Sequence, residues 1–128
     1  MRLESKQKVL ITGASGFIGK HVCQALLGKN IHVIALLRNE QHVMATESCA
    51  LDLRDREHVF SVLEKLQPDY VVHLAAVKTR SVLLLDYRLA FEGNFLTSLN
   101  LIEACQQVTS LKRFIYIGSC EEYGEQKL

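Results

Sequence analysis

Three glycines, Gly13, Gly16 and Gly19, stand at regular spacing just after a short apolar run near the start of the chain. Residues 8–11 have the composition of a buried strand, and the glycines fall within residues 12–19. Glycine has no Cβ, so it can take a positive φ and let a phosphate oxygen approach the backbone amides. An apolar helical pattern begins right after Gly16, and its positive N-terminal end would face the same place. The segment predicts a site for a bulky anion, most simply the pyrophosphate of a dinucleotide.

The glycine spacing also separates this segment from related turns. It is Gly-x-x-Gly-x-x-Gly, and it does not fit a mononucleotide P-loop. That motif needs glycine where Ala14 stands and Ser or Thr where His21 stands. The alternative is an ordinary strand–turn–helix corner without a ligand.

The rest of the chain alternates apolar runs with amphipathic stretches. Strands are predicted at residues 8–11, 31–37, 46–53, 69–77 and 113–117. The pattern indicates an α/β fold of Rossmann type: a doubly wound parallel sheet in three layers. Residues 1–128 would form one dinucleotide-binding domain.

Helices are predicted after Gly16, after Asp55 and over residues 82–107. Asp55 can cap the second helix, and Gly28 or Asn30 can end the first in a left-handed conformation. The long third helix carries an apolar stripe that we expect to face the core: Phe91, Phe95, Leu99 and Ile102.

Ligands of parallel α/β sheets bind at the carboxyl ends of the strands. Besides the glycine turn, polar residues expected at those ends are Arg38, Asp52, His73, Lys78 and Ser119. His73 fits a packed histidine at a strand end better than a general base. The convergence of these residues on one sheet edge favours a ligand site over a plain corner.

Composition sets the remaining bounds. The chain has 128 residues, 48% of them hydrophobic, and a formal net charge of +1. This suits one soluble core and gives no field for binding nucleic acid, and no apolar stretch is long enough to cross a membrane. The four cysteines have no Cys-x-x-Cys pair, which indicates reduced thiols in a cytoplasmic protein without a metal site.

Five segments in order resemble the extended short-chain dehydrogenase/reductases, the group of NAD(P)-dependent nucleotide-sugar epimerases, dehydratases and 4-ketoreductases. The resemblance runs from about residue 6 to the end of the chain. Its segments are the glycine turn at 12–19, Asp-Leu-Arg-Asp at 52–55, His-Leu-Ala-Ala at 73–76, Asn94 with 99–104, and 114–119 leading to Glu-Glu-Tyr-Gly at 121–124.

The resemblance implies roles in binding the cofactor. The three glycines would contact the pyrophosphate, together with the backbone amides of Phe17 and Ile18. Asp52 would accept a hydrogen bond from the adenine amino group, with Leu53 near the ring. Ala75 and Ala76 would line the nicotinamide-ribose side, with Lys78 near that ribose. Leu74 and Asn94 would also bind beside the cofactor.

The residues at the end of the second predicted strand indicate which cofactor binds. Enzymes that prefer NAD usually place a carboxylate there to bind the ribose hydroxyls. In this chain the position holds Leu37, followed by Arg38. Because a guanidinium suits a 2′-phosphate, we predict NADP, with NAD as the alternative.

The resemblance also locates the catalytic groups. Ser119 falls where the family's Ser or Thr hydrogen-bonds the sugar hydroxyl that is oxidised. The family's Tyr-x-x-x-Lys pair lies roughly 25 residues further on, beyond Leu128. Tyr123 and Lys127 match that string, but Tyr123 already belongs to the Glu-Glu-Tyr-Gly segment. The resemblance thus implies a fold truncated after the fifth strand, with the C-terminal substrate-binding part absent, and a chain that is inactive alone. In the full-length enzyme the substrate would be a nucleotide sugar.

The residues leave the reaction open. Lys78 is typical of epimerases, whereas the segment around Glu121 is closer to reductases and 4,6-dehydratases, and Cys120 replaces the dehydratase aspartate. The resemblance also implies a homodimer through the helix containing Asn94. Two alternatives are a non-catalytic dinucleotide-binding or redox-sensing module, and an interaction piece that no longer binds a ligand.

Overall fold

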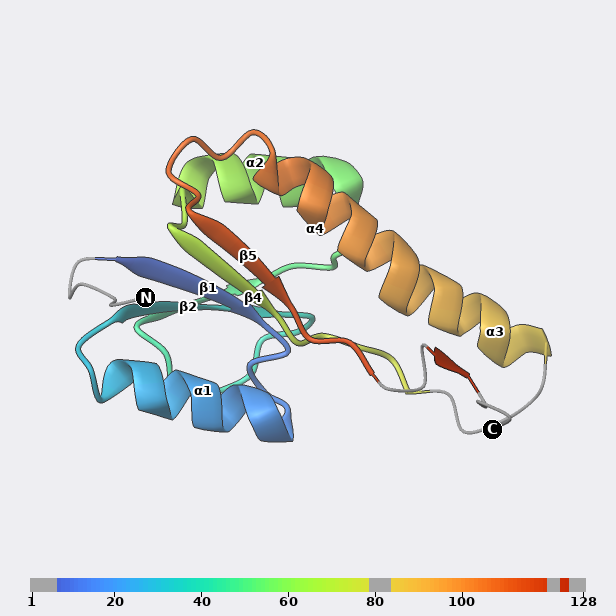
Figure 1. Ribbon diagram of the computed structural model, residues 1–128, viewed down its shortest axis with the longest axis horizontal. Helices are drawn as coiled ribbons and strands as arrows, with labels where there is room; N and C mark the ends of the chain where they lie inside the picture. The colour runs from blue at the N-terminus through green and yellow to red at the C-terminus, as the bar shows by residue number, and fades with distance from the viewer. Residues whose placement is uncertain (1–6, 79–83, 120–122, 125–128) are drawn as a thin grey trace.

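A single parallel sheet forms the centre of the molecule (Figure 1). The computed structural model describes residues 7–78, 84–119 and 123–124. Five strands lie in the order β3-β2-β1-β4-β5, and each adjacent pair is parallel. The bounds are β1 Lys8–Thr12, β2 His32–Leu37, β3 Glu47–Ala50, β4 Tyr70–His73 and β5 Arg113–Tyr116.

Helices cover both faces of this sheet. The helix α1 (Phe17–Leu27) lies on one face, whereas α2 (Arg56–Leu66) and α4 (Thr97–Cys105) lie together on the other (Figure 1). The helix α4 continues α3 (Leu84–Ala90) through a six-residue π-helical segment, η1 (Phe91–Leu96). The predicted three-layer Rossmann-type fold is confirmed.

Alternate residues of the inner strands supply two separate cores. Leu10 and Ile34 pack with Val59 and Leu63 of α2, together with residues of α4. Their neighbours along the strands, such as Ile11, face the opposite way and pack with Cys23 of α1. Both sides of β1 and β2 are buried, which is why these runs are apolar throughout.

The ends of the helices follow local chemistry. The Asp55 carboxylate caps α2 by accepting the backbone N–H of His58 at 3.1 Å, as predicted. After α1, Asn30 takes the left-handed conformation at φ 57°, whereas Gly28 keeps helical angles. Gln67 is also left-handed at φ 45°, directly before Pro68.

Two strands are shorter than predicted. The strand β3 ends at Ala50, so Asp52 lies in the loop beyond it. The strand β4 ends at His73, although the apolar run continues to Val77. The Thr12 hydroxyl accepts the backbone N–H groups of Leu74 and Ala75, although the Leu74 N–H also still donates to the Thr12 carbonyl oxygen at 3.3 Å.

The prediction for the long helix was wrong in its buried face. Phe91 and Phe95 are 57% and 55% exposed, and Leu99 and Ile102 are 38% and 41% exposed. The buried residues of α4 are Thr97, Asn100, Leu101, Ala104 and Cys105. The Asn100 amide donates to the backbone oxygen of Leu53 at 2.9 Å, so a polar side chain holds this helix against the loop after β3.

Candidate functional site

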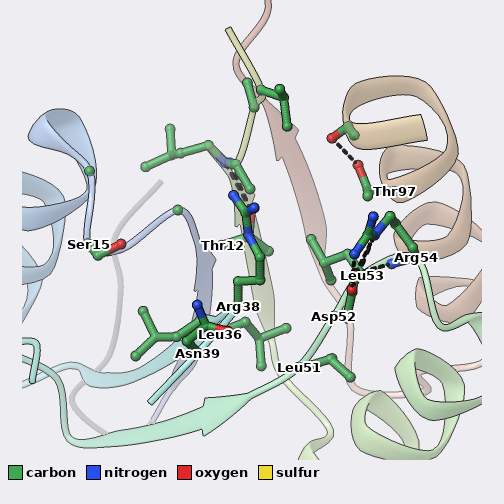
Figure 2. Close-up of a pocket in the computed structure, with 18 of the residues that line it drawn as sticks. Thr12, Ser15, Leu36, Arg38, Asn39, Leu51, Asp52, Leu53, Arg54 and Thr97 are labelled. Atoms are coloured by element: carbon green, nitrogen blue, oxygen red, sulfur yellow. Dashed lines mark hydrogen bonds and ion pairs between the residues drawn. The ribbon is translucent and has the colours of Figure 1, made fainter. Parts of the chain in front are cut away.

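A cleft of about 570 Å³ opens at the carboxyl ends of the strands. Its walls come from the glycine turn, the ends of β2 and β4, the loop after β3 and the helix η1 with its neighbours (Figure 2). The lining residues are Thr12, Gly13, Ser15, Gly16, Leu36, Leu37, Arg38, Asn39, Gln41, Leu51, Asp52, Leu53, Arg54, Leu74, Ala75, Ala76, Val77, Leu89, Gly93 and Thr97.

The glycine turn brings the backbone close to the cleft. Gly13 has φ +70°, and a Cβ there would lie 2.8 Å from the backbone nitrogen of Ala75. Gly16 precedes α1 in an extended conformation without a side-chain cap, and its backbone N–H donates to Gly13 O at 3.0 Å. Gly19 is buried, and a Cβ there would overlap the backbone of Gly13 and Ala14.

The first turn of α1 has free space and a positive end. Phe17 and Ile18 are 83% and 55% exposed, and the first turn carries no acidic residue. The first backbone N–H groups of any α-helix have no partner within the helix, and they concentrate positive potential. A phosphate can therefore approach Gly16, Phe17 and Ile18 without competition from a carboxylate of the same turn.

At the end of the cleft near β2 and β3, one arginine pairs with a carboxylate and a second arginine lines the cleft. Arg54 donates to both carboxylate oxygens of Asp52, at 3.0 Å from Nε to Oδ1 and 2.6 Å from Nη2 to Oδ2. This contact, with a smaller effect of Arg38, lowers the pKa of Asp52 to about 2. Figure 2 shows the pair at the loop after β3, with Arg38 on the β2 side.

A buried histidine connects two walls of the cleft. His73 is 1% exposed, with Nδ1 2.6 Å from the Thr12 hydroxyl and Nε2 2.9 Å from the Ser98 hydroxyl. Burial lowers the pKa of His73 to about 4, so the ring is neutral near neutral pH. The prediction of a packed histidine is confirmed.

The helix wall approaches the loop after β4 very closely. The Asn94 side chain accepts the backbone N–H of Val77 at 2.6 Å and donates to its backbone oxygen at 3.0 Å. A Cβ on the adjacent Gly93 would overlap the Val77 side chain. Asn94 therefore shapes the wall, and Gly93 and Val77 form its surface in the cleft.

The structure brings most of the predicted cofactor residues together. Those that line the cleft are Gly13, Gly16, Arg38, Asp52, Leu53, Leu74, Ala75 and Ala76. The remaining predicted residues do not line it: Phe17, Ile18, Gly19, Lys78, Asn94 and Ser119. Ser119 is exposed beyond the end of β5, and Lys78 is exposed at the end of the described loop. Sequence reasoning assigned no role to Thr12 or Ser98, although Thr12 begins the glycine-turn segment 12–19 and Ser98 directly precedes the segment 99–104.

Other predictions concern metals, thiols and membranes. Within residues 7–78, 84–119 and 123–124, no three His, Cys, Asp or Glu side chains gather closely enough to hold a metal ion. Cys23 and Cys105 are buried, and burial raises the pKa of the Cys105 thiol to about 12. Cys120 and Glu121 lie outside the described residues. None of the helices described is long and apolar enough to pass through a membrane.

Comparison with known proteins identifies the family. Residues 9–128 match the family described as NAD dependent epimerase/dehydratase. The chain belongs to the NAD-dependent epimerase/dehydratase family. The resemblance noted in the sequence is thereby confirmed.

Members of the epimerase/dehydratase family with known names or structures are similar along most of this chain. GDP-mannose 3,5-epimerase of Arabidopsis thaliana is 32% identical, covering 94% of this chain and 33% of the relative. The UDP-Glc/GlcNAc 4-epimerase of Campylobacter jejuni is 25% identical with a TM-score of 0.84, covering 95% of this chain and 40% of that structure. Thermus thermophilus UDP-glucose 4-epimerase in complex with NAD is 36% identical with a TM-score of 0.70, covering 80% and 34%. The chain thus spans two fifths or less of the length of these family members.

Proposed function

We propose that this chain is the dinucleotide-binding part of a nucleotide-sugar epimerase, dehydratase or reductase, and that it prefers NADP to NAD. The observation that carries the proposal is the start of α1 beside the cleft, where the first amides of the helix have neither a side-chain cap nor an acidic residue next to them. A Cβ at Gly13 or Gly16 would intrude on the neighbouring backbone, so only glycine keeps the turn this tight, and the uncapped amides fit a diphosphate.

The proposed contacts follow the walls of the cleft. Gly13, Gly16 and Gly19 with the amides of Phe17 and Ile18 hold the pyrophosphate, and Asp52 with Leu53 holds the adenine. Leu74, Ala75 and Ala76 lie beside the nicotinamide ribose, and Lys78 reaches it from the end of the loop. Asn94 acts on this side through the backbone of Val77. When bound, the cofactor supplies hydride transfer to and from a sugar carbon.

The preference for NADP rests on charge at the adenosine end. Arg54 pairs with the Asp52 carboxylate at 2.6 Å, and Arg38 lines the same cleft on the β2 side. No acidic residue follows β2 directly, because Leu37 is followed by Arg38 and Asn39. A 2′-phosphate would meet net positive charge here, and Arg38 can bind it through paired hydrogen bonds. NAD is the competing cofactor, as in the Thermus thermophilus complex.

Two further parts of the proposal concern chemistry and assembly. Ser119 positions the sugar hydroxyl. The Tyr and Lys that move the proton in this family are not among the residues of this chain. We therefore expect the chain to bind a dinucleotide without turnover. The helix containing Asn94 forms a homodimer contact, and the exposed side chains of Phe91, Phe95, Leu99 and Ile102 support this.

Calorimetric titration of the chain with NADPH and NADH tests the proposal. NADPH is expected to bind about tenfold more tightly, and Arg38→Ser is expected to weaken NADPH while leaving NADH nearly unchanged. Tighter binding of NADH would refute the NADP preference alone. Absence of heat and of any thermal shift with both cofactors at millimolar concentration would refute dinucleotide binding and favour an interaction piece.

A further inference from the structure

A continuous row of hydrogen bonds runs from the end of β1 to the helix η1–α4. It joins the Thr12 hydroxyl to His73 Nδ1 at 2.6 Å and His73 Nε2 to the Ser98 hydroxyl at 2.9 Å. The Ser98 hydroxyl also contacts the backbone oxygen of Asn94. Thr12 and His73 are each 1% exposed, so water does not compete for these bonds.

Counting donors and acceptors gives the direction of each bond in the row. Thr12 Oγ1 accepts the backbone N–H groups of Ala75 at 3.1 Å and Leu74 at 3.2 Å, and the Leu74 N–H is shared with the Thr12 carbonyl oxygen at 3.3 Å. These two amides occupy the acceptor side of Oγ1, which directs its own proton to His73 Nδ1. At the other end the Asn94 carbonyl can only accept, so Ser98 donates to it and accepts from His73 Nε2–H. His73 is then neutral, with its proton on Nε2.

The row holds one wall of the cleft at several points. The segment Leu74–Val77 lines the cleft, and Thr12 binds its first two backbone amides. Asn94 binds both backbone polar atoms of Val77 at the other end of the segment. Ser98 lies one helical turn from Asn94, so His73 connects the two anchoring sides of the same segment.

We propose that His73 is a positioning residue of the dinucleotide site, which fixes the segment Leu74–Val77 by bridging Thr12 and Ser98. The inference rests on the proposed function, because the segment it fixes is the proposed nicotinamide-ribose wall. His73 does not line the cleft and acts through Thr12. Imidazole suits this role because it accepts at one nitrogen and donates at the other.

Packing alone is the competing explanation. The His73 ring lies 6.2 Å from the Phe114 ring and 5.7 Å from the Tyr116 ring, measured between centroids. A phenylalanine would preserve these ring contacts and remove both hydrogen bonds. His73→Phe therefore separates a packing role from a hydrogen-bonding role.

The tautomer provides a test that needs no cofactor. Nitrogen-15 spectra of the histidine rings are expected to show the His73 proton on Nε2. The His73 signals are assigned by their loss in His73→Phe or, if that variant does not fold, through the atoms bonded to the ring. A proton on Nδ1 would overturn the row as we have directed it, whether or not the chain binds a dinucleotide.

Binding of NADPH and NADH provides the second test. His73→Phe is expected to weaken the tighter-binding cofactor about tenfold, at a temperature where circular dichroism shows the variant folded. Ser98→Ala is expected to weaken it several-fold, and the matched variant Ser98→Thr, which keeps the hydroxyl, to restore wild-type affinity. If His73 acts through Thr12, the double variant Thr12→Val/His73→Phe is expected to bind the cofactor as tightly as the single variant with the lower affinity.

The possible outcomes distinguish the positioning role of His73 from dinucleotide binding itself. Wild-type affinity in folded His73→Phe or in Ser98→Ala would overturn the positioning role while leaving dinucleotide binding intact. If His73→Phe does not fold, the affinities of Ser98→Ala and Ser98→Thr decide whether the positioning role holds. A wild-type chain that binds neither NADPH nor NADH overturns the proposed function, and the positioning role falls with it.

Discussion

The Asn94 side chain satisfies both backbone polar atoms of Val77, with Oδ1 at 2.6 Å from the amide nitrogen and Nδ2 at 3.0 Å from the carbonyl oxygen. The two residues belong to different elements, since Asn94 lies in η1 and Val77 in the loop after β4. An amide side chain is well suited to this contact because it carries a donor and an acceptor side by side. The contact fixes the spacing between the helix and the loop that it faces.

Removal of this amide is expected to loosen the cleft. Asn94→Ala leaves the Val77 N–H and C=O without their partners, which costs about 1–3 kcal/mol of unfolding free energy and lowers the affinity for dinucleotide. Urea denaturation and calorimetry measure the two effects. Gln24→Ala, an exposed position on α1, is the control and is expected to change neither. Wild-type stability in Asn94→Ala would contradict the importance of the contact.

Two glycines with different surroundings give a matched pair of variants. Gly16→Ala places a methyl group 3.2 Å from Gly13 O, at the start of α1 where a phosphate would approach, so dinucleotide affinity is expected to fall by about tenfold or more. Gly28→Ala adds a Cβ at an ordinary 3.4 Å from Gln24 O, with helical φ of −62°. It is expected to bind normally and to gain up to about 1 kcal/mol in stability.

Calorimetry with NADPH and NADH compares the two glycine variants. Equal affinity of Gly16→Ala and Gly28→Ala for either cofactor would place the diphosphate away from this turn.

The sheet could be predicted from sequence because its inner strands are apolar on both faces and are separated by helical patterns. The glycine turn could also be predicted from sequence, because a close approach of the backbone at one place in the chain requires glycine there. The length of β4 could not be predicted in the same way. It depends on contacts with β1, which is distant in sequence: the Thr12 hydroxyl accepts the Ala75 N–H and shares the Leu74 N–H with the Thr12 carbonyl oxygen.

The helix that carries Asn94 shows why the rest of the site escaped prediction. Its periodicity marks an apolar stripe at Phe91 and Phe95, but periodicity does not say what covers a stripe, and both rings are exposed. The buried face instead uses Thr97 and Asn100, whose polar groups bond to backbone oxygens. The π-helical turn and the partners of His73 arise from contacts across the fold, which a local pattern does not encode.

Stability is expected to fall in mild acid because of His73. Burial lowers its pKa to about 4 from 6.5, so between these values the unfolded chain binds the proton and the folded chain does not. The stabilisation is complete above about pH 6.5, decreases as pH falls, and amounts to roughly 3 kcal/mol in total. Urea denaturation at about pH 7 and about pH 5 measures the decrease.

Most of the decrease in stability in mild acid is expected to come from protonation of the His73 ring. His73→Phe is expected to remove most of it, whereas His42→Gln, at an exposed position, is expected to retain it. The same acid sensitivity in His73→Phe as in the wild type would show that other groups are responsible.

Self-association is expected to involve the exposed face of η1. The Phe91 and Phe95 rings stack at 4.9 Å between centroids and are more than half exposed. Changing both to Glu is expected to shift a dimer toward monomer in sedimentation experiments, with unfolding free energy of the monomer changed by no more than about 0.5 kcal/mol. Met44→Glu, also at an exposed side chain, is the control. A wild-type chain that is monomeric at all concentrations would contradict the proposed dimer.

The directed row through His73 also limits how charge can travel inside this fold. A proton wire must be able to reverse every one of its bonds after each passage. Here the row ends at the carbonyl of Asn94, which has no proton to give, and begins at the Thr12 hydroxyl, which accepts from two main-chain amides, one of them shared with the Thr12 carbonyl oxygen. The row therefore cannot relay a proton, and in the proposed function the protons that accompany hydride transfer would move on the solvent side of the cleft.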